Sequence, residues 1–195
     1  MKPVKNFVLI GLTLFIVTGC DELIKKNVDV PITFEVFQEI DKQETNEQNP
    51  TFSFEGYFDI LSHPDVANAI GTPDKIKKIK ITKIQYEFRN FEGDVDAVIN
   101  GKIYLPEEKS VSDPSPEYYT YSIPPVKVAE SVLLKELYTL DGYFNKVNDY
   151  LTETTVFEYS FHGYSSHYPV NFYMVLHVSA TVSVEASIDY KGNYN

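Results

Sequence analysis

The sequence predicts a mainly β protein, either an antiparallel β-sandwich or one strongly curved sheet, with about seven or eight strands. Two observations carry this prediction. Apolar and polar residues alternate along most of the chain, which is typical of strands with one buried face. Only residues 129–151 change to the three- and four-residue spacing of an amphipathic helix, so we expect a helical insertion there.

Alternation defines the first two strands. Apart from Gln38, the even positions from residue 28 to residue 40 are apolar, and residues 52–60 repeat the pattern after a polar stretch at 41–50. We expect this polar stretch to be a long hairpin connection. A short helical turn is expected at residues 63–71, because Pro64 suits a first helical turn and Gly71 suits a helix end.

The next two strands come in the middle of the chain. Residues 75–91 shift from odd to even apolar positions, which a bulge near Thr82 would explain. Residues 95–105 then alternate on odd positions. Gly93 and the acidic residues around it indicate a hairpin turn between these two strands.

A further strand begins at Tyr119, and the Pro124-Pro125 pair should interrupt or end it. The helical insertion that follows falls into two pieces joined near Gly142, and Asp141 could cap the second piece. The apolar stripe of the insertion needs a surface to cover. We therefore expect five of its residues to lie mostly against the protein's own sheets: Leu133, Leu137, Phe144, Val147 and Leu151.

The last strand has the clearest pattern in the chain. Every even position from Phe172 to Tyr190 is apolar, and most odd positions are polar or small. Such a strand would reach about 60 Å, so we expect it to bend, or to divide near Ser179 and Ala180. Seven apolar residues break the parity of their strands and would point away from the assigned core: Phe37, Tyr57, Leu61, Val98, Tyr104, Tyr173 and Val175.

Composition and charge limit the possible functions. The 195-residue chain has a net charge of −11, and Arg89 is its single arginine. Phosphate backbones require basic surface, and arginine is the best bidentate phosphate ligand, so nucleic acid is not an expected partner. Apolar residues make up 43% of the chain, too many for a disordered tether, and the length suits one domain.

The N-terminus carries a processing signal. Residues 1–19 contain no acidic residue, and Lys2 and Lys5 precede a short apolar run that extends to Val17. This is the layout of a secretory signal peptide, and the run is too short to span a bilayer. The residues that follow, Val17-Thr18-Gly19-Cys20, resemble the bacterial lipobox.

The resemblance covers only the first 20 residues. It implies cleavage before Cys20 and a diacylglyceryl group on its thiol; ordinary secretion with cleavage at Gly19, or a buried free thiol, is the alternative. The chain would then comprise a signal peptide (1–19), a lipidated cysteine and tether (20–27) and a single β-rich domain (28–195). Loss of the signal peptide removes two lysines, so the mature net charge would be −13.

Asp21 and Glu22 bear on the choice of membrane. In enterobacterial lipoproteins an Asp directly after the cysteine resembles an inner-membrane retention signal, whereas in Bacteroidota acidic residues there resemble a surface-export signal. The strong bias for lysine over arginine indicates an AT-rich genome and suits the second resemblance. We expect the outer membrane, with surface exposure and the inner membrane as open alternatives.

Two patterns invite a catalytic or metal site built on histidine. The segment His162-Gly163-Tyr164-Ser165-Ser166-His167 lacks the second glycine of a nucleophile elbow, and small residues in a hairpin tip explain it without catalysis. His162, His167 and His177 could ligate a metal. However, a hairpin turn at 163–169 would place His162 and His177 about 20 Å apart.

Three other sets of charged or aromatic residues each allow two interpretations. Glu92, Asp94 and Asp96, with Asn100, could bind calcium, although solvated acids beside a turn are the default. The lysines at 75, 77, 78, 80 and 83 could meet an anionic lipid or sugar, but more simply protect a sheet edge. The 15 tyrosines and 13 phenylalanines could form a sugar-binding platform, although the chain has no tryptophan.

The sequence therefore predicts a membrane-anchored envelope lipoprotein that acts as a binding or structural interaction module. We expect no enzymatic activity, no cofactor and no metal. Its partners would be the membrane, through the lipid, and an unidentified protein or ligand. The alternative is a carrier or binding protein for an apolar or sugar ligand held by the curved sheet and the helices. An apolar cavity of several hundred Å³ would favour the carrier.

Overall fold

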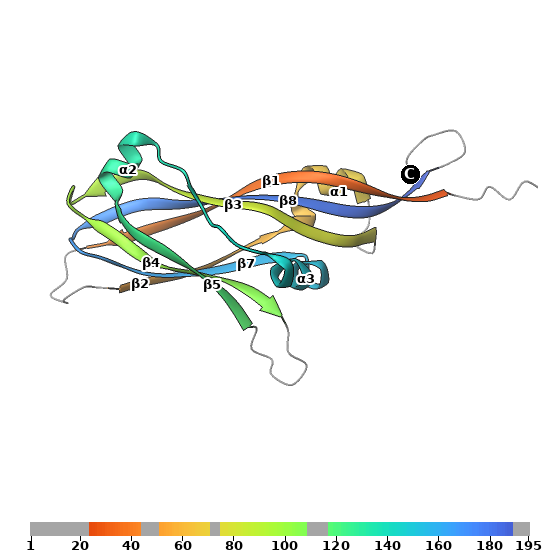
Figure 1. Cartoon of the computed structure of the whole chain (residues 1–195). Helices are drawn as coiled ribbons and strands as arrows, with labels where there is room; N and C mark the ends of the chain where they lie inside the picture. The colour runs from red at the N-terminus through yellow and green to blue at the C-terminus, as the bar shows by residue number, and fades with distance from the viewer. Residues whose placement is uncertain (1–23, 44–50, 71–74, 109–116, 189–195) are drawn as a thin grey trace, which may run out of the picture.

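Two layers of strands lie face to face in the computed structural model of the chain (Figure 1). The structure describes residues 24–43, 51–70, 75–108 and 117–188. In these ranges there are eight strands in two four-stranded sheets, and neighbouring strands pair antiparallel. The predicted mainly β, antiparallel sandwich is confirmed.

The order of the strands is that of a jelly roll. Sheet A contains, side by side, β1 (Ile24–Lys42), β8 (Val170–Ile188), β3 (Ile76–Gly93) and β6 (Tyr138–Thr139). Sheet B contains β2 (Thr51–Asp59), β7 (Val156–Ser165), β4 (Val98–Glu108) and β5 (Glu117–Lys127). Apart from β4 and β5, consecutive strands belong to opposite sheets, as in an eight-stranded jelly roll.

The hairpins expected at residues 41–50, at Gly93 and at 163–169 are therefore wrong. At each of these places the chain passes from one sheet to the other instead of returning beside the same strand. The error has a physical cause. Alternation reports which side of a strand is buried, and it carries no information about which strand lies next to it.

The predicted alternation of buried and exposed positions along the long strands is confirmed. On β8 the even positions from 172 to 184 are all buried in the core, where the ring of Phe172 meets that of Phe52 from sheet B. β8 does not divide near Ser179: it pairs without a register shift along the whole of β1. The bulge expected at Thr82 is present, because Ile81 and Lys83 pair with the adjacent residues Ala180 and Ser179.

The proline pair does not end its strand. β5 continues through Pro124 and Pro125 to Lys127, with a register shift against β4 at that point. β5 is an edge strand, so the missing N–H groups cost it little, and the shift absorbs the extra residue.

The helices cover the ends and one side of the sandwich (Figure 1). A 3-10 turn (Ile60–Ser62) leads into α1 (Pro64–Ile70), which confirms the helical turn near 63–71; Gly71 lies outside the described residues. The predicted insertion comprises α2 (Val128–Leu134) and α3 (Asn145–Thr154), with β6 between them. No helix in the described ranges is long and apolar enough to cross a membrane.

The expectation for the apolar stripe is right for the second piece of the insertion and wrong for the first. Phe144, Val147 and Leu151 are buried, but Leu133 is 80% exposed and Leu137 is 49% exposed. α2 ends after seven residues at the left-handed Lys135, so the stripe does not continue as one helix. The N-cap of α3 is Phe144 and makes no side-chain cap, so the role expected for Asp141 is also wrong.

The parity-breaking residues do not form one patch. Val175 is fully buried, while Leu61, Val98, Tyr104 and Tyr173 are half-buried. The two that are most exposed, Phe37 and Tyr57, lie on β1 and β2, which belong to different sheets. Val95, expected on a buried face, is 64% exposed because it precedes β4 in a turn.

Candidate functional site

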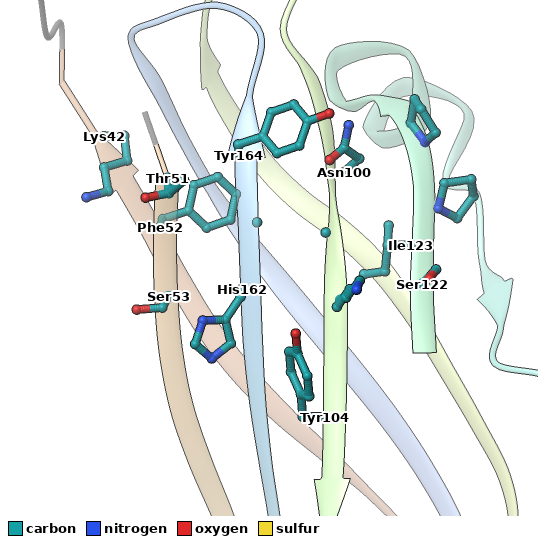
Figure 2. A pocket seen from close by; sticks show the side chains of 15 residues that line it. Lys42, Thr51, Phe52, Ser53, Asn100, Tyr104, Ser122, Ile123, His162 and Tyr164 are labelled. Carbon is teal, nitrogen blue, oxygen red and sulfur yellow. The ribbon is translucent and has the colours of Figure 1, made fainter. Parts of the chain in front are cut away.

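The strongest candidate site is a groove of about 920 Å³ on the outer face of sheet B (Figure 2). It crosses all four strands of the sheet and reaches the end of β1 at Lys42. It is lined by Lys42, Thr51, Phe52, Ser53, Asn100, Gly101, Lys102, Tyr104, Ser122, Ile123, Pro124, Pro125, His162, Gly163 and Tyr164.

Strand register builds the floor of the groove. Ser53 pairs with His162, His162 with Lys102, and Lys102 with Ser122, so these four side chains form one row across the sheet. All four are exposed, as the polar positions of alternating strands should be. At a strand spacing of about 4.8 Å, the row is about 14 Å long.

A second row of side chains runs beside the first, nearer the start of β2. Tyr164 pairs with both Thr51 and Asn100, and Figure 2 shows Tyr164 and Asn100 close together at this end of the groove. Tyr164 is 41% exposed. In the first row, the ring of His162 meets that of Tyr104 edge to face, with 5.2 Å between centroids. The groove thus offers aromatic surface beside hydroxyl and amide groups.

A pair of glycines lies in the floor of the groove. Gly101 and Gly163 face each other on β4 and β7, above the fully buried ring of Phe161. A Cβ on Gly101 would lie 2.4 Å from the carbonyl oxygen of His162, and a Cβ on Gly163 would lie 2.7 Å from the Phe161 ring. Larger residues would therefore push apart the strands that carry the groove.

The charge of the groove differs from that of the chain. No described residue that lines it is acidic, although the chain has 28 Asp and Glu residues. Lys102 lies in the middle of the polar row, and among the described residues no carboxylate pairs with it. Other lysines do have partners: Lys77 pairs with Glu185 at 3.1 Å, and Lys127 with Asp96 at 2.9 Å.

The structure separates the histidines that were considered as metal ligands. His162 lies in the groove of sheet B, whereas His177 lies on β8 in sheet A. The expectation that a 163–169 hairpin would align them on paired strands is wrong, because β7 and β8 do not pair. No cluster of three or more metal-ligating side chains occurs within the described parts of the chain.

The serine segment lacks the geometry of a nucleophile elbow. β7 continues into a turn and then β8, not into a helix. Ser165 is buried, and its hydroxyl donates to the carbonyl of His167 at 2.7 Å. Ser166 Oγ lies 2.8 Å from His167 Nδ1, but both side chains are exposed and adjacent in sequence.

The acids considered for calcium are engaged elsewhere. Asp94 accepts a hydrogen bond from the backbone N–H of Asp96 at 2.8 Å, which closes the turn before β4. The carboxylate of Asp96 accepts from Lys127, and that hydrogen bond lowers the pKa of Asp96. Glu92 lies on β3 in the other sheet.

Four of the five lysines of the run lie on β3 and Lys75 directly precedes it; β3 forms the edge of sheet A wherever the two-residue β6 does not pair with it. Part of this edge is covered by α3. The N–H of Ile81 donates to Asn148 Oδ1 at 2.7 Å, and the N–H of Ile79 donates to Thr152 Oγ1 at 2.9 Å. The exposed lysines and the helix together occupy an edge that could otherwise pair with another chain.

The outer face of sheet A carries an ionic cluster that the sequence did not suggest. His177 Nε2 lies 2.8 Å from Glu87 Oε1, and its Nδ1 lies 3.1 Å from Glu35 Oε1. Arg89 Nε donates to Glu87 at 2.7 Å, and the Arg89 guanidinium lies over the Phe37 ring, 5.6 Å from its centroid. These residues come from β1, β3 and β8 and meet only because those strands are neighbours.

Burial of the Glu87 carboxyl would by itself raise its pKa. Hydrogen bonds from Arg89 and His177 outweigh that effect, so the pKa of Glu87 lies below its ordinary value. Glu35 and Glu87 each contact both Arg89 and His177, which indicates a structural role in holding three strands together.

Comparison with known proteins gives only distant likenesses. No protein-family model matches the chain, and no curated protein is detectably similar to it. Among solved structures, a chain of Desmodium yellow mottle tymovirus is similar to this one. The alignment covers 95% of this chain and 95% of the viral chain, with 7% identity and a TM-score of 0.37. A second similar structure is the decameric BFDV capsid protein. The alignment covers 80% of this chain and 99% of the capsid chain, with 10% identity and a TM-score of 0.40. At these scores the likenesses carry no argument about function.

Proposed function

We propose that this chain is a membrane-anchored, non-enzymatic module of the bacterial envelope that binds a carbohydrate in the groove of sheet B. The groove is the observation that carries the proposal. It is open, it crosses four strands, and it combines tyrosine rings with hydroxyl, amide and imidazole groups. A sugar needs this combination, because it presents hydroxyl groups at its edge and C–H groups on its faces.

An apolar ligand suits this groove less well than a sugar. The side chains exposed along the groove are mainly polar, and the space between the sheets is filled by buried residues of both. The anchor rests on the lipobox resemblance at Cys20, which lies outside the described residues.

The carbohydrate part of the proposal can be tested by affinity electrophoresis through gels that each contain one soluble polysaccharide, neutral or acidic. We expect at least one polysaccharide to retard the wild-type protein. The double variant His162→Ala/Tyr164→Ala should migrate as it does in a plain gel. Tyr57→Ala is the matched control, because Tyr57 is 74% exposed on the same sheet but does not line the groove. Equal retardation of wild type and double variant, or no retardation in any gel, would refute carbohydrate binding in the groove.

The anchor needs a separate experiment. Cys20→Ser should abolish incorporation of a labelled fatty acid and leave an unprocessed precursor. Equal incorporation by the variant and the wild type would show that Cys20 is not the lipidated residue.

A further inference from the structure

We infer that the carbohydrate bound in this groove is acidic, a chain that contains hexuronate, and that Lys102 binds its carboxylate. The inference rests on the proposed carbohydrate binding and makes it more specific. It is carried by the position of Lys102 and by the charge that surrounds it.

Lys102 lies at the centre of the proposed site. It pairs with His162 on one side and with Ser122 on the other, so its ammonium group rises from the middle of the polar row. A ligand that crosses the strands along this row must pass it. The ammonium provides up to three donors and no acceptor, so its best partner is an anionic oxygen.

The described residues around Lys102 provide no anionic oxygen for its ammonium group, so we expect the ligand to provide it. Acidic residues are absent from the described lining of the groove, and no described carboxylate pairs with Lys102. Lys42, at the margin of the same groove, adds a second positive charge. In a chain with a net charge of −11, two lysines and no acid among the described residues of the lining give this surface a local excess of positive charge.

The overall charge also limits the ligand. A dense polyanion, such as nucleic acid or a heavily sulfated chain, would be repelled by the 28 acidic residues of the protein. A carbohydrate with one carboxylate on a sugar ring carries less charge and keeps the hydroxyl groups and C–H faces for which the groove is suited. Hexuronate has this chemistry.

The test compares two trisaccharides that differ only at C6: α-1,4-linked trigalacturonate and the corresponding neutral galactose trisaccharide. Binding to the mature lipoprotein in detergent micelles is measured by isothermal titration calorimetry. We expect the acidic trisaccharide to bind about tenfold or more tightly than the neutral one, because a charge-assisted hydrogen bond is added. Lys102→Gln should remove that difference, and Lys102→Arg should retain most of it.

Lys80→Gln is the control, since it removes the same charge from the exposed face of sheet A. Equal affinity for the two trisaccharides, with no effect of Lys102→Gln, would overturn the inference. So would a failure of both to bind while a polysaccharide gel still retards the protein. In either case carbohydrate binding would stand. If no gel retards the protein, the proposed function itself fails.

Discussion

Two buried tyrosines differ in how their hydroxyl groups are satisfied. Tyr159 on β7 is 3% exposed, its Oη has no hydrogen-bond partner among the described residues, and burial raises its pKa to about 12. Its ring occupies the space that a side chain at Gly56 would fill. Tyr150 on α3 is 6% exposed, and its hydroxyl donates to Glu158 at 2.7 Å. Shape explains the burial of Tyr159, whereas Tyr150 also makes a hydrogen bond.

We therefore expect opposite effects when each hydroxyl is removed. Tyr159→Phe should leave the free energy of unfolding unchanged or raise it, because a buried unsatisfied hydroxyl is lost. Tyr150→Phe should lower it by about 1 kcal/mol, because a hydrogen bond to a carboxylate is lost. Urea unfolding of both variants measures the difference. A larger loss for Tyr159→Phe would mean that its hydroxyl has a partner.

The ionic cluster of sheet A gives a prediction about pH. The pKa of Glu87 is lowered in the folded state, so its contribution to stability is present above the unfolded pKa, near 4.3, and is lost as pH falls through the lower folded value. Glu87→Gln should therefore destabilise the protein at pH 7 and have a progressively smaller effect below about pH 4. Thermal unfolding across this range is the measurement. A constant difference between variant and wild type would contradict the ionic role.

At the scale of elements, α3 does more than cover apolar surface. Asn148 is 5% exposed and its amide oxygen accepts from the N–H of Ile81, on the edge of β3. One turn later, the hydroxyl oxygen of Thr152 accepts a hydrogen bond from the N–H of Ile79. The helix thus replaces the neighbouring strand that β3 lacks there, and buried backbone groups remain paired.

Asn148→Ala should lower the free energy of unfolding by about 1–3 kcal/mol, because the buried N–H of Ile81 would lose its acceptor. The exposed neighbour Asp149 provides the control on the same helix, and Asp149→Ala should change stability by less than about 0.5 kcal/mol. Chemical denaturation compares the two. Similar small effects would indicate that water reaches the edge of β3.

The central strand of sheet A gives the second prediction at this scale. Leu176 is 1% exposed, and Leu176→Asp should cost about 4 kcal/mol or more, since it buries an unpaired charge. Ser179 points to the opposite face, beside Thr33 and Lys83, and Ser179→Asp should cost about 1 kcal/mol or less. Melting temperatures report the difference. Equal losses would show that β8 tolerates a charge on neither face.

The whole molecule is elongated, and its two described ends lie together. Ile24 pairs with Ile188, while the groove begins near Lys42, at the other end of β1. The length of that strand places the groove about 60 Å from Ile24. If Cys20 carried a lipid, Ile24 would lie within about 14 Å of the membrane surface, because four extended residues span at most that distance. Anchor and groove would then occupy opposite ends of the domain (Figure 1).

This arrangement predicts how the anchored protein stands on a membrane. If the chain is cleaved and lipidated at Cys20 as proposed, its net charge would be −13 and would be repelled by anionic headgroups, so we expect the long axis to point away from the bilayer. Neutron reflectometry of the lipoprotein in an anionic supported bilayer should show a protein layer about 60 Å thick at low salt. A layer of half that thickness, unchanged by salt, would mean that the domain lies flat.

Some residues of the groove stood out in the sequence for reasons unrelated to a groove. His162 was considered as a metal ligand or part of a catalytic segment, Asn100 as a calcium ligand, and Tyr104 as an apolar residue out of phase. Nothing in the sequence connects Ser53 with Lys102 or Ser122. They are separated by long stretches of chain, and only the pairing of β2, β7, β4 and β5 makes them neighbours.

The sequence by itself determined where most of the long strands lie, which of their faces are buried, where β3 bulges and where the helices interrupt the strands. These properties follow from local spacing, because side chains alternate along a strand and recur every three or four residues along a helix. Tertiary structure alone decided which strands are neighbours. Alternation does not identify the partner of a strand, so the jelly-roll order, the ionic cluster and the groove depend on long-range pairing.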